Sequence, residues 1–206
     1  MFKNHIKIAW RNLVKNKKYS LINLAGLSIG MTCYILIALF IQYEISFDRH
    51  HEKADRIYRI AQRQIGNEYR GTDKFALAPL PLSKALVNDF PEVEAVANLN
   101  QDFTLLVNGK ETYPEQGLST DAHFFEVFSV PLLQGNRESI FEDINTIILT
   151  ESLAKKIFGS QSPIGKSIAY ARNRNMTVSG VIPDPPKNQH LIYTYLISYK
   201  ITSVLF

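Results

Sequence analysis

Cysteine is almost absent from the sequence: Cys33 is the single one among 206 residues, and it lies in the most apolar stretch of the chain. A disulfide framework within one copy is therefore excluded. This scarcity leaves the compartment open, because many extracytoplasmic domains with adequate cores contain no disulfide. The apolar content of 46%, with 11% aromatic residues, is sufficient for a folded core.

Acidic residues are missing from residues 1–18, which carry six Lys and Arg side chains. The rest of the chain holds 17 basic and 19 acidic residues, so the net charge of +4 comes from this short segment. The remainder gives no indication of a basic surface for nucleic acid, and we expect no nucleic-acid partner.

Patterns for catalysis or metal binding are also lacking. The five histidines stand at no spacing typical of zinc ligands, and the adjacent His50 and His51 would face different sides of a helix. The segment 159–167 ends like a phosphate-binding loop, but five residues separate Gly159 from Gly165 where four are needed, and it follows a predicted helix rather than a strand. We therefore expect no catalytic residue, metal or cofactor, and any ATP hydrolysis must come from another chain.

One long stretch is free of charge. Residues 19–43 contain no Asp, Glu, Lys, Arg or His, and residues 21–41 are predominantly apolar. A helix of this length crosses the hydrocarbon core of a bilayer, about 30 Å thick. The alternative is a buried helix of a soluble protein, which rarely stays uncharged for so long. We predict a transmembrane helix over 19–46.

The flanks of this stretch predict its orientation. The basic residues precede it, and a mixture of acids and bases follows it, so the positive-inside rule places residues 1–18 in the cytoplasm and residues after about 46 outside it. A cleaved signal peptide would have a shorter apolar region followed by a small-x-small site, which is missing here.

Residues 1–18 have the pattern of an amphipathic helix, with apolar residues at three- and four-residue intervals and Lys3, Lys7, Trp10 and Arg11 among them. These four residues are predicted to lie at the membrane interface. The alternative is that the charges only set the topology of the span. Within the span, Gly26 and Gly30 form a small-xxx-small pattern, a weak indication of helix packing.

After the span, the pattern predicts an α+β fold, a mixed α/β domain over 47–206. The helix of the span is expected to continue as a short stalk over 47–54. Asp121 and Thr150 are predicted helix caps, and Gly159 a helix end. Helices are expected over 79–90, 122–128 and 151–158, and strands over 55–64, 93–98, 103–107, 110–113, 146–149, 166–170, 176–182 and 191–199.

Four segments in order resemble the FtsX-like family of ABC-transporter permeases with a MacB-type periplasmic core domain: residues 8–31, 124–136, 149–168 and 178–199. The resemblance implies a permease of the bacterial inner membrane, with the residues after about 46 in the periplasm. Such a permease dimerises with a second permease subunit and works with a cytoplasmic ATP-binding cassette ATPase. In such permeases, the ATPase docks on a loop between the second and third of four spans, and its closure moves the periplasmic domains.

Because the sequence stops at Phe206, before any second span, the resemblance covers the N-terminal part of such a permease. We expect a transport component whose periplasmic domain engages a substrate, adaptor or lipoprotein. The rival hypotheses are a single-pass sensor, a tethered extracytoplasmic binding protein and a tethered enzyme; the last is disfavoured by the missing catalytic residues.

Overall fold

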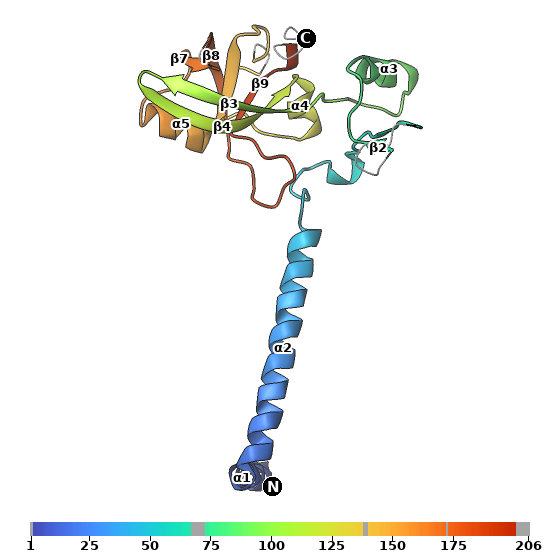
Figure 1. Cartoon of the computed structure of the whole chain (residues 1–206), viewed down its shortest axis with the longest axis vertical. Coiled ribbons are helices and arrows are strands. Elements are labelled where there is room, and N and C mark those ends of the chain that lie inside the picture. The colour runs from blue at the N-terminus through green and yellow to red at the C-terminus, as the bar shows by residue number, and fades with distance from the viewer. Residues whose placement is uncertain (1, 67–72, 138–139, 172, 201–206) are drawn as a thin grey trace. The chain divides into compact units, whose positions relative to one another are not determined.

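The computed structural model describes residues 2–66, 73–137, 140–171 and 173–200, shown in Figure 1. The chain divides into two compact units, Met1–Phe47 and Asp48–Phe206. The described part of the first unit consists of two helices and short turns, and the second unit mixes helices with a seven-stranded sheet. The α+β fold class is therefore confirmed.

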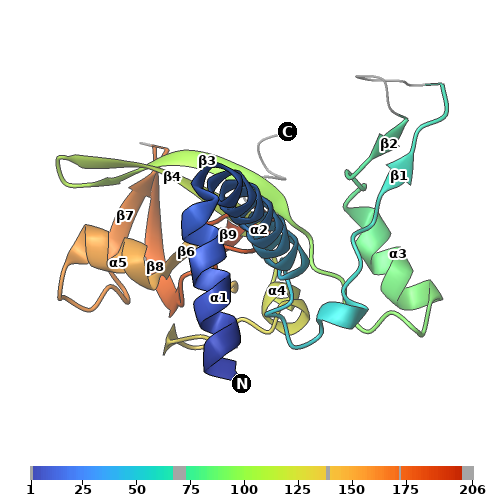
Figure 2. The same cartoon turned by 90° about the horizontal axis from the view of Figure 1, so that it is seen from below.

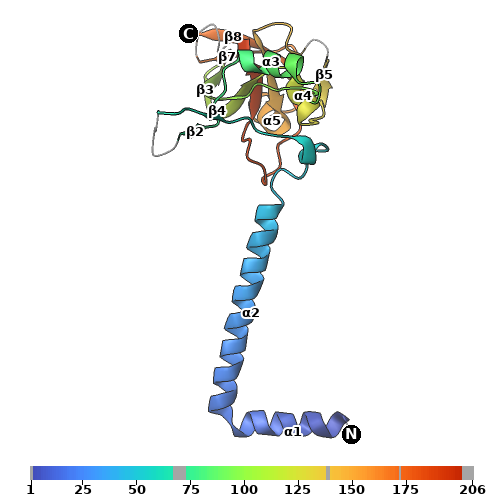
Figure 3. The ribbon, with the colours of Figure 1, turned by 90° about the vertical axis from the view of Figure 1, so that its right-hand side faces the viewer.

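The first unit consists of helix α1 (Phe2–Lys15) and helix α2 (Lys17–Ile45). Asn16 separates them with a non-helical backbone (φ −107°, ψ 51°), and Figure 3 shows the sharp bend at this point. The predicted stalk over 47–54 is wrong, because the helix ends at Ile45 and the chain turns. Asp48 adopts a left-handed backbone (φ 55°), which is incompatible with a continuing helix.

The second unit begins with a segment that has little regular structure. It contains a 3₁₀ turn, η1 (Ala54–Arg56), two short paired strands, β1 (Gln62–Arg63) and β2 (Lys74–Phe75), and helix α3 (Pro81–Asp89). The helix ends before Pro91, as predicted. The predicted strand over 55–64 shrinks to two residues, and no strand forms over 93–98, because neither segment has a long partner strand within the described part of the chain.

Seven strands and two helices follow. The strands are β3 (Asn100–Asn108), β4 (Glu111–Thr120), β5 (Gln134–Gly135), β6 (Thr146–Thr150), β7 (Ser167–Tyr170), β8 (Arg174–Ile182) and β9 (Tyr195–Ser198). The helices are α4 (His123–Val127) and α5 (Glu151–Phe158). These elements confirm most of the strands and helices that the sequence predicts beyond residue 100.

The strands close into a ring. Their order is β5-β8-β6-β9-β4-β3-β7, and β7 also pairs with β8, so six strands form a closed circuit and β5 lies outside it on β8. Figure 2 shows β3 and β4 as one long curved hairpin, and Gly109 (φ 62°) supplies the left-handed residue of its turn. Closure satisfies the backbone groups that an open sheet would leave at its edges.

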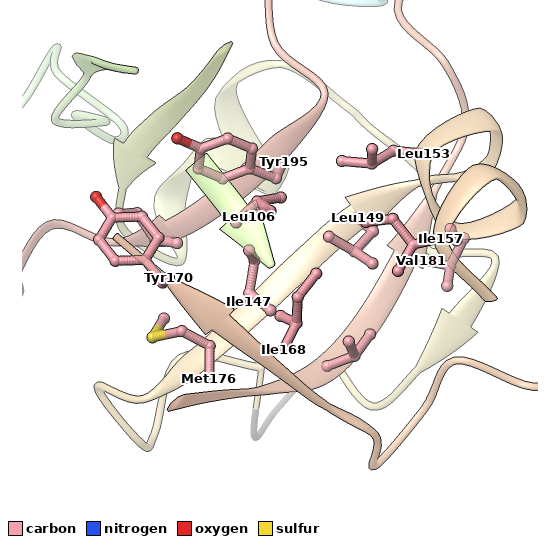
Figure 4. Close-up of a cluster of buried hydrophobic side chains, with 13 residues drawn as sticks. Leu106, Ile147, Leu149, Leu153, Ile157, Ile168, Tyr170, Met176, Val181 and Tyr195 are labelled. Carbon is pink, nitrogen blue, oxygen red and sulfur yellow. The ribbon is translucent and has the colours of Figure 1, made fainter. Parts of the chain in front are cut away.

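Alternation along β6 builds two cores. Ile147 and Leu149 lie in one cluster and Ile148 in another, because successive side chains of a strand point to opposite faces. Helix α5 covers the first cluster, which Figure 4 shows. Helix α4 contributes Phe124 and Phe125 to the second cluster.

Local capping explains why α5 lies where the sequence predicts it. The Thr150 hydroxyl accepts a hydrogen bond from the backbone N–H of Leu153 (3.4 Å), and Gly159 ends the helix with φ 63°. The side chain of Asp121 accepts from the N–H of His123 (3.1 Å) at the start of α4, also as predicted.

Candidate functional site: the membrane anchor and the base of the core domain

The basic residues of α1 form one stripe. Lys3, Lys7, Arg11 and Lys15 follow at four-residue intervals and therefore share one side of the helix. Trp10 lies beside this stripe and is 68% exposed. A stripe of cations with a neighbouring indole suits the boundary between lipid headgroups and hydrocarbon, so the helix groups the four residues predicted for the membrane interface.

Helix α2 has the dimensions of a membrane span. It is 29 residues long with a mean hydropathy of 2.2 over its most apolar window, and none of that window is buried. It is therefore long and apolar enough to cross a bilayer. The hydroxyl of Thr32 donates to the carbonyl of Ser28 (2.8 Å), so this polar group is satisfied within the helix.

Gly26 and Gly30 lie on α2 with open space around them. A methyl group built on either residue would meet no atom within 4 Å. The surface at these glycines is accessible to another helix, and the packing role predicted for them stays a prediction.

The second unit starts with a group of polar contacts that sequence reasoning missed. The carboxylate of Asp48 accepts from the backbone N–H of His190 (3.0 Å) and pairs with Nδ1 of the same residue (2.6 Å). Partial burial raises the pKa of Asp48, but the hydrogen bonds and charge of His190 outweigh it and hold the pKa below the usual value. No local pattern could have found this pair, because 142 residues separate its members.

His51 makes a second contact near this group. Its Nδ1 lies 2.9 Å from the carbonyl oxygen of Phe128, and its ring packs edge-on against the Phe128 ring (centroids 5.2 Å apart). His50 stacks beside His51 at 3.9 Å, and burial together with the charge of His51 lowers the pKa of His50. The two rings lie side by side outside any helix, so the prediction that they face different sides of a helix is wrong.

Asp102 ties together three strands of the ring. The Tyr170 hydroxyl of β7 donates to both of its carboxylate oxygens (2.9 and 2.8 Å), and the Tyr195 hydroxyl of β9 donates to one of them. Burial and the Asp102 charge raise the pKa of both tyrosines above the usual value, so both remain protonated donors. The Tyr195 ring lies over Gly117 of β4, where no larger side chain would fit.

The loop that imitates a phosphate site is a structural turn. It lies between α5 and β7, where Gly165 adopts φ 78° and donates its N–H to the carbonyl of Val178 (2.8 Å). The ammonium of Lys166 binds the side-chain oxygen of Gln161 and lies 5.2 Å from the centre of the Phe158 ring. Among the described residues, no group of three or more His, Cys, Asp or Glu side chains could hold a metal ion.

The chain thus combines one apolar helix that is long enough to cross a membrane with a closed ring of strands in a domain of mixed α+β fold. The family model of the MacB-like periplasmic core domain matches residues 20–203, and the chain belongs to this family. A search of curated proteins found no match.

Three solved structures are similar to the chain. A domain of a candidate permease protein from Porphyromonas gingivalis has 26% identity and a TM-score of 0.56, with 68% of this chain and 60% of that one covered. The periplasmic region of MacB from Actinobacillus actinomycetemcomitans has 19% identity and a TM-score of 0.44, with 57% and 55% covered. The extracellular domain of the noncanonic ABC-type transporter YknZ from Gram-positive bacteria has 14% identity and a TM-score of 0.46, with 59% and 65% covered.

The chain therefore spans between about half and two thirds of the length of these structures. One of these structures is named as a permease domain and another as a transporter domain. The expected resemblance to MacB-type permease domains is confirmed at the level of the family.

Proposed function

We propose that the chain is a permease component of an ABC transporter that links the motion of an ATPase in a partner chain to a periplasmic domain. The periplasmic domain would engage a substrate, an adaptor or a lipoprotein. The observation that carries this proposal is the family match over residues 20–203, which includes most of the apolar helix α2 and the whole ring of strands.

The charge distribution of α1 supports a cytoplasmic N-terminus. The six basic residues of positions 1–18 precede the span, and positive residues are retained on the cytoplasmic side during insertion. In this arrangement, Lys3, Lys7, Trp10 and Arg11 lie at the inner leaflet, where each cation near anionic lipid contributes about 1 kcal/mol. The domain that contains the ring of strands, residues 100–198, is called the ring domain below. In this arrangement it lies in the periplasm.

Cysteine labelling tests this orientation directly, because the chain has one cysteine to remove. In a Cys33→Ser background, Lys110→Cys places a thiol at the exposed turn after β3, and Asn12→Cys places one on α1. A membrane-impermeant maleimide added to spheroplasts should label position 110, and should label position 12 only after permeabilisation. Labelling in the reverse order would overturn the proposed orientation.

Packing at Gly26 and Gly30 is proposed to bring α2 against a helix of the second permease subunit. Replacing both glycines by leucine would prevent close approach of the two backbones. Cross-linking in membranes should then lose the dimer, whereas Ser28→Leu, an increase in size on the opposite side of α2, should keep it. Equal cross-linking in both variants would contradict the proposed packing role of the two glycines.

Co-purification tests the partner. When the chain is purified from its native host in mild detergent, an ATP-binding cassette ATPase and the second permease subunit should be recovered with it. A membrane fraction that yields the chain with no ATPase would count against a transporter role and favour a single-pass sensor or a tethered binding protein.

A further inference from the structure

The contacts that hold the chain change abruptly between residues 47 and 48. Phe47 donates its N–H to the carbonyl of Glu44 (3.3 Å) and packs its ring edge-on against Tyr43 (5.2 Å), so it belongs to the end of α2. Asp48 instead donates its N–H to the carbonyl of Asn188 (3.0 Å). The first residue after the helical unit is thus bound directly to the loop that leads into β9.

Asp48 is held in an unusual conformation by this loop. Its φ of 55° is rare for any residue other than glycine, and aspartate is among the few that tolerate it. The backbone bond to Asn188 and the two side-chain contacts with His190 keep it there. A strained backbone persists only where its surroundings determine it strongly.

The Asp48–His190 contact and the His51–Phe128 contact both connect residues 48–51 to the same hydrophobic cluster. Phe128 packs on the buried Phe124 (centroids 5.1 Å apart), and the loop with His190 continues to Tyr193, which packs on Phe124 as well (5.7 Å). Tyr193 is 4% exposed, and burial raises its pKa to about 12. Residues 48–51 are therefore attached to the second hydrophobic cluster of the ring domain.

The covalent route from Asp48 to the ring is much longer. Along the chain, residues 48–99 come before β3, and the described part of this stretch holds two strands of two residues and a helix, with no buried residue. Extended, these residues would span roughly 170 Å. If a force on the helical unit reached the ring only along residues 48–99, it would first extend this weakly packed stretch. The ring would move only after that extension.

We propose that the Asp48–His190 and His51–Phe128 contacts form a latch through which a displacement of the span enters the ring domain, bypassing residues 48–99. The latch rests on the proposed function, since it gives the route by which the span would move the periplasmic domain. The latch itself is a property of this chain and needs no ATPase to be measured.

Single-molecule pulling on the full chain in lipid nanodiscs tests the latch. In a Cys33→Ser background, one handle is attached to Glu44→Cys at the exposed end of α2 and the other to Lys110→Cys at the β3–β4 turn, so that the load passes through Asp48. With Asp48 unchanged, the latch should carry the load, and the distance between the two handles should not increase until a high force is reached. Loss of the latch should produce an early extension of up to about 170 Å at clearly lower force.

The variants separate the carboxylate from the backbone. Asp48→Gly removes the side-chain acceptor while permitting the positive φ, so it should show the early extension. Asp48→Asn keeps an acceptor and tolerates the same φ, so its force should lie between those of Asp48→Gly and the wild type. His123→Ala is the matched control, because it removes a surface His–carboxylate pair (His123–Glu126, 3.3 Å) away from the latch.

Identical force distributions for the wild type and Asp48→Gly would overturn the latch. Hydrogen exchange of residues 186–194 provides a second measurement: Asp48→Gly should raise it severalfold and His123→Ala should leave it unchanged. Failure to recover an ATPase would contradict the proposed function but would not affect the pulling and hydrogen-exchange results. A failure of the proposed function can therefore be distinguished from a failure of the latch.

Discussion

The two units of the chain treat their apolar side chains in opposite ways. In α2, the large apolar residues are between 49% and 76% exposed, and none of its residues is buried. Among the described residues of the ring domain, 21 apolar residues are buried, all between Leu106 and Ile197. The ring therefore supplies its own apolar surroundings, whereas α2 requires them from outside the chain, as a membrane would provide.

The largest expected effect falls on the unit that buries its own core. Ile147→Ala removes buried methyl groups from the first cluster, where the side chain has no exposed surface, and should lower the free energy of unfolding by about 2–5 kcal/mol. Thermal unfolding of the ring domain within the full chain in detergent measures it. Ile29→Ala in α2 makes the same chemical change on an exposed helix and should leave that unfolding unchanged; an equal loss would break the comparison.

A charge in the span tests the other unit. Ile29→Arg places a guanidinium near the centre of α2, where its insertion should cost about 2.5–3.5 kcal/mol. We expect a larger fraction of the chain to be released from membranes by carbonate. Phe103→Arg is the control, because this side chain is 68% exposed on β3 and the substitution should not affect membrane retention.

The same contrast explains what the sequence could predict. Helix α5 depends on neighbours in the chain, namely the cap Thr150 and the terminal Gly159, and its prediction is confirmed. The strand over 93–98 was wrong because its existence depends on a distant partner, and Asn98 instead donates its backbone and side-chain N–H groups to Asp121. Apolar periodicity reports which face is buried and not which strands pair.

The polar contacts of the ring domain were beyond prediction for the same reason. Asp102 and Tyr195 lie opposite each other only because β3, β4 and β9 adjoin in register, with Gly117 between them. The exposed basic stripe of α1 was predictable, since four-residue spacing in the sequence is also proximity on a helix.

Gly117 tests whether register creates this contact. Gly117→Ala would place a methyl group within the Tyr195 ring and should cost about 1–3 kcal/mol through overpacking. Tyr195→Phe removes the hydroxyl that donates to Asp102 and should cost about 1 kcal/mol. Denaturant unfolding measures both. If Gly117→Ala in the Tyr195→Ala background still destabilises as much as alone, the ring is not what excludes the methyl group.

The smallest effect concerns the pH dependence of the segment that begins the second unit. Burial, followed by the charge of His51, lowers the pKa of His50 below 6.5, although Asp48 and Gln189 act in the opposite direction. Since the folded segment binds this proton less readily than the unfolded one, its contribution to stability is present above pH 6.5 and lost as the pH falls below that value.

The pair of Asp48 and His190 should survive this acidification, because the pKa of Asp48 is held below 3.8 and its contribution is lost only as the pH falls through that lower pKa. The hydrogen-exchange rate of residues 48–53, corrected for intrinsic rates, should therefore increase modestly when the pH is lowered from about 7.5 to about 5.5. The rise is modest because His50 is exposed. His50→Gln should abolish it while His123→Gln keeps it; the same rise in His50→Gln would assign the effect to His51 or His190 instead.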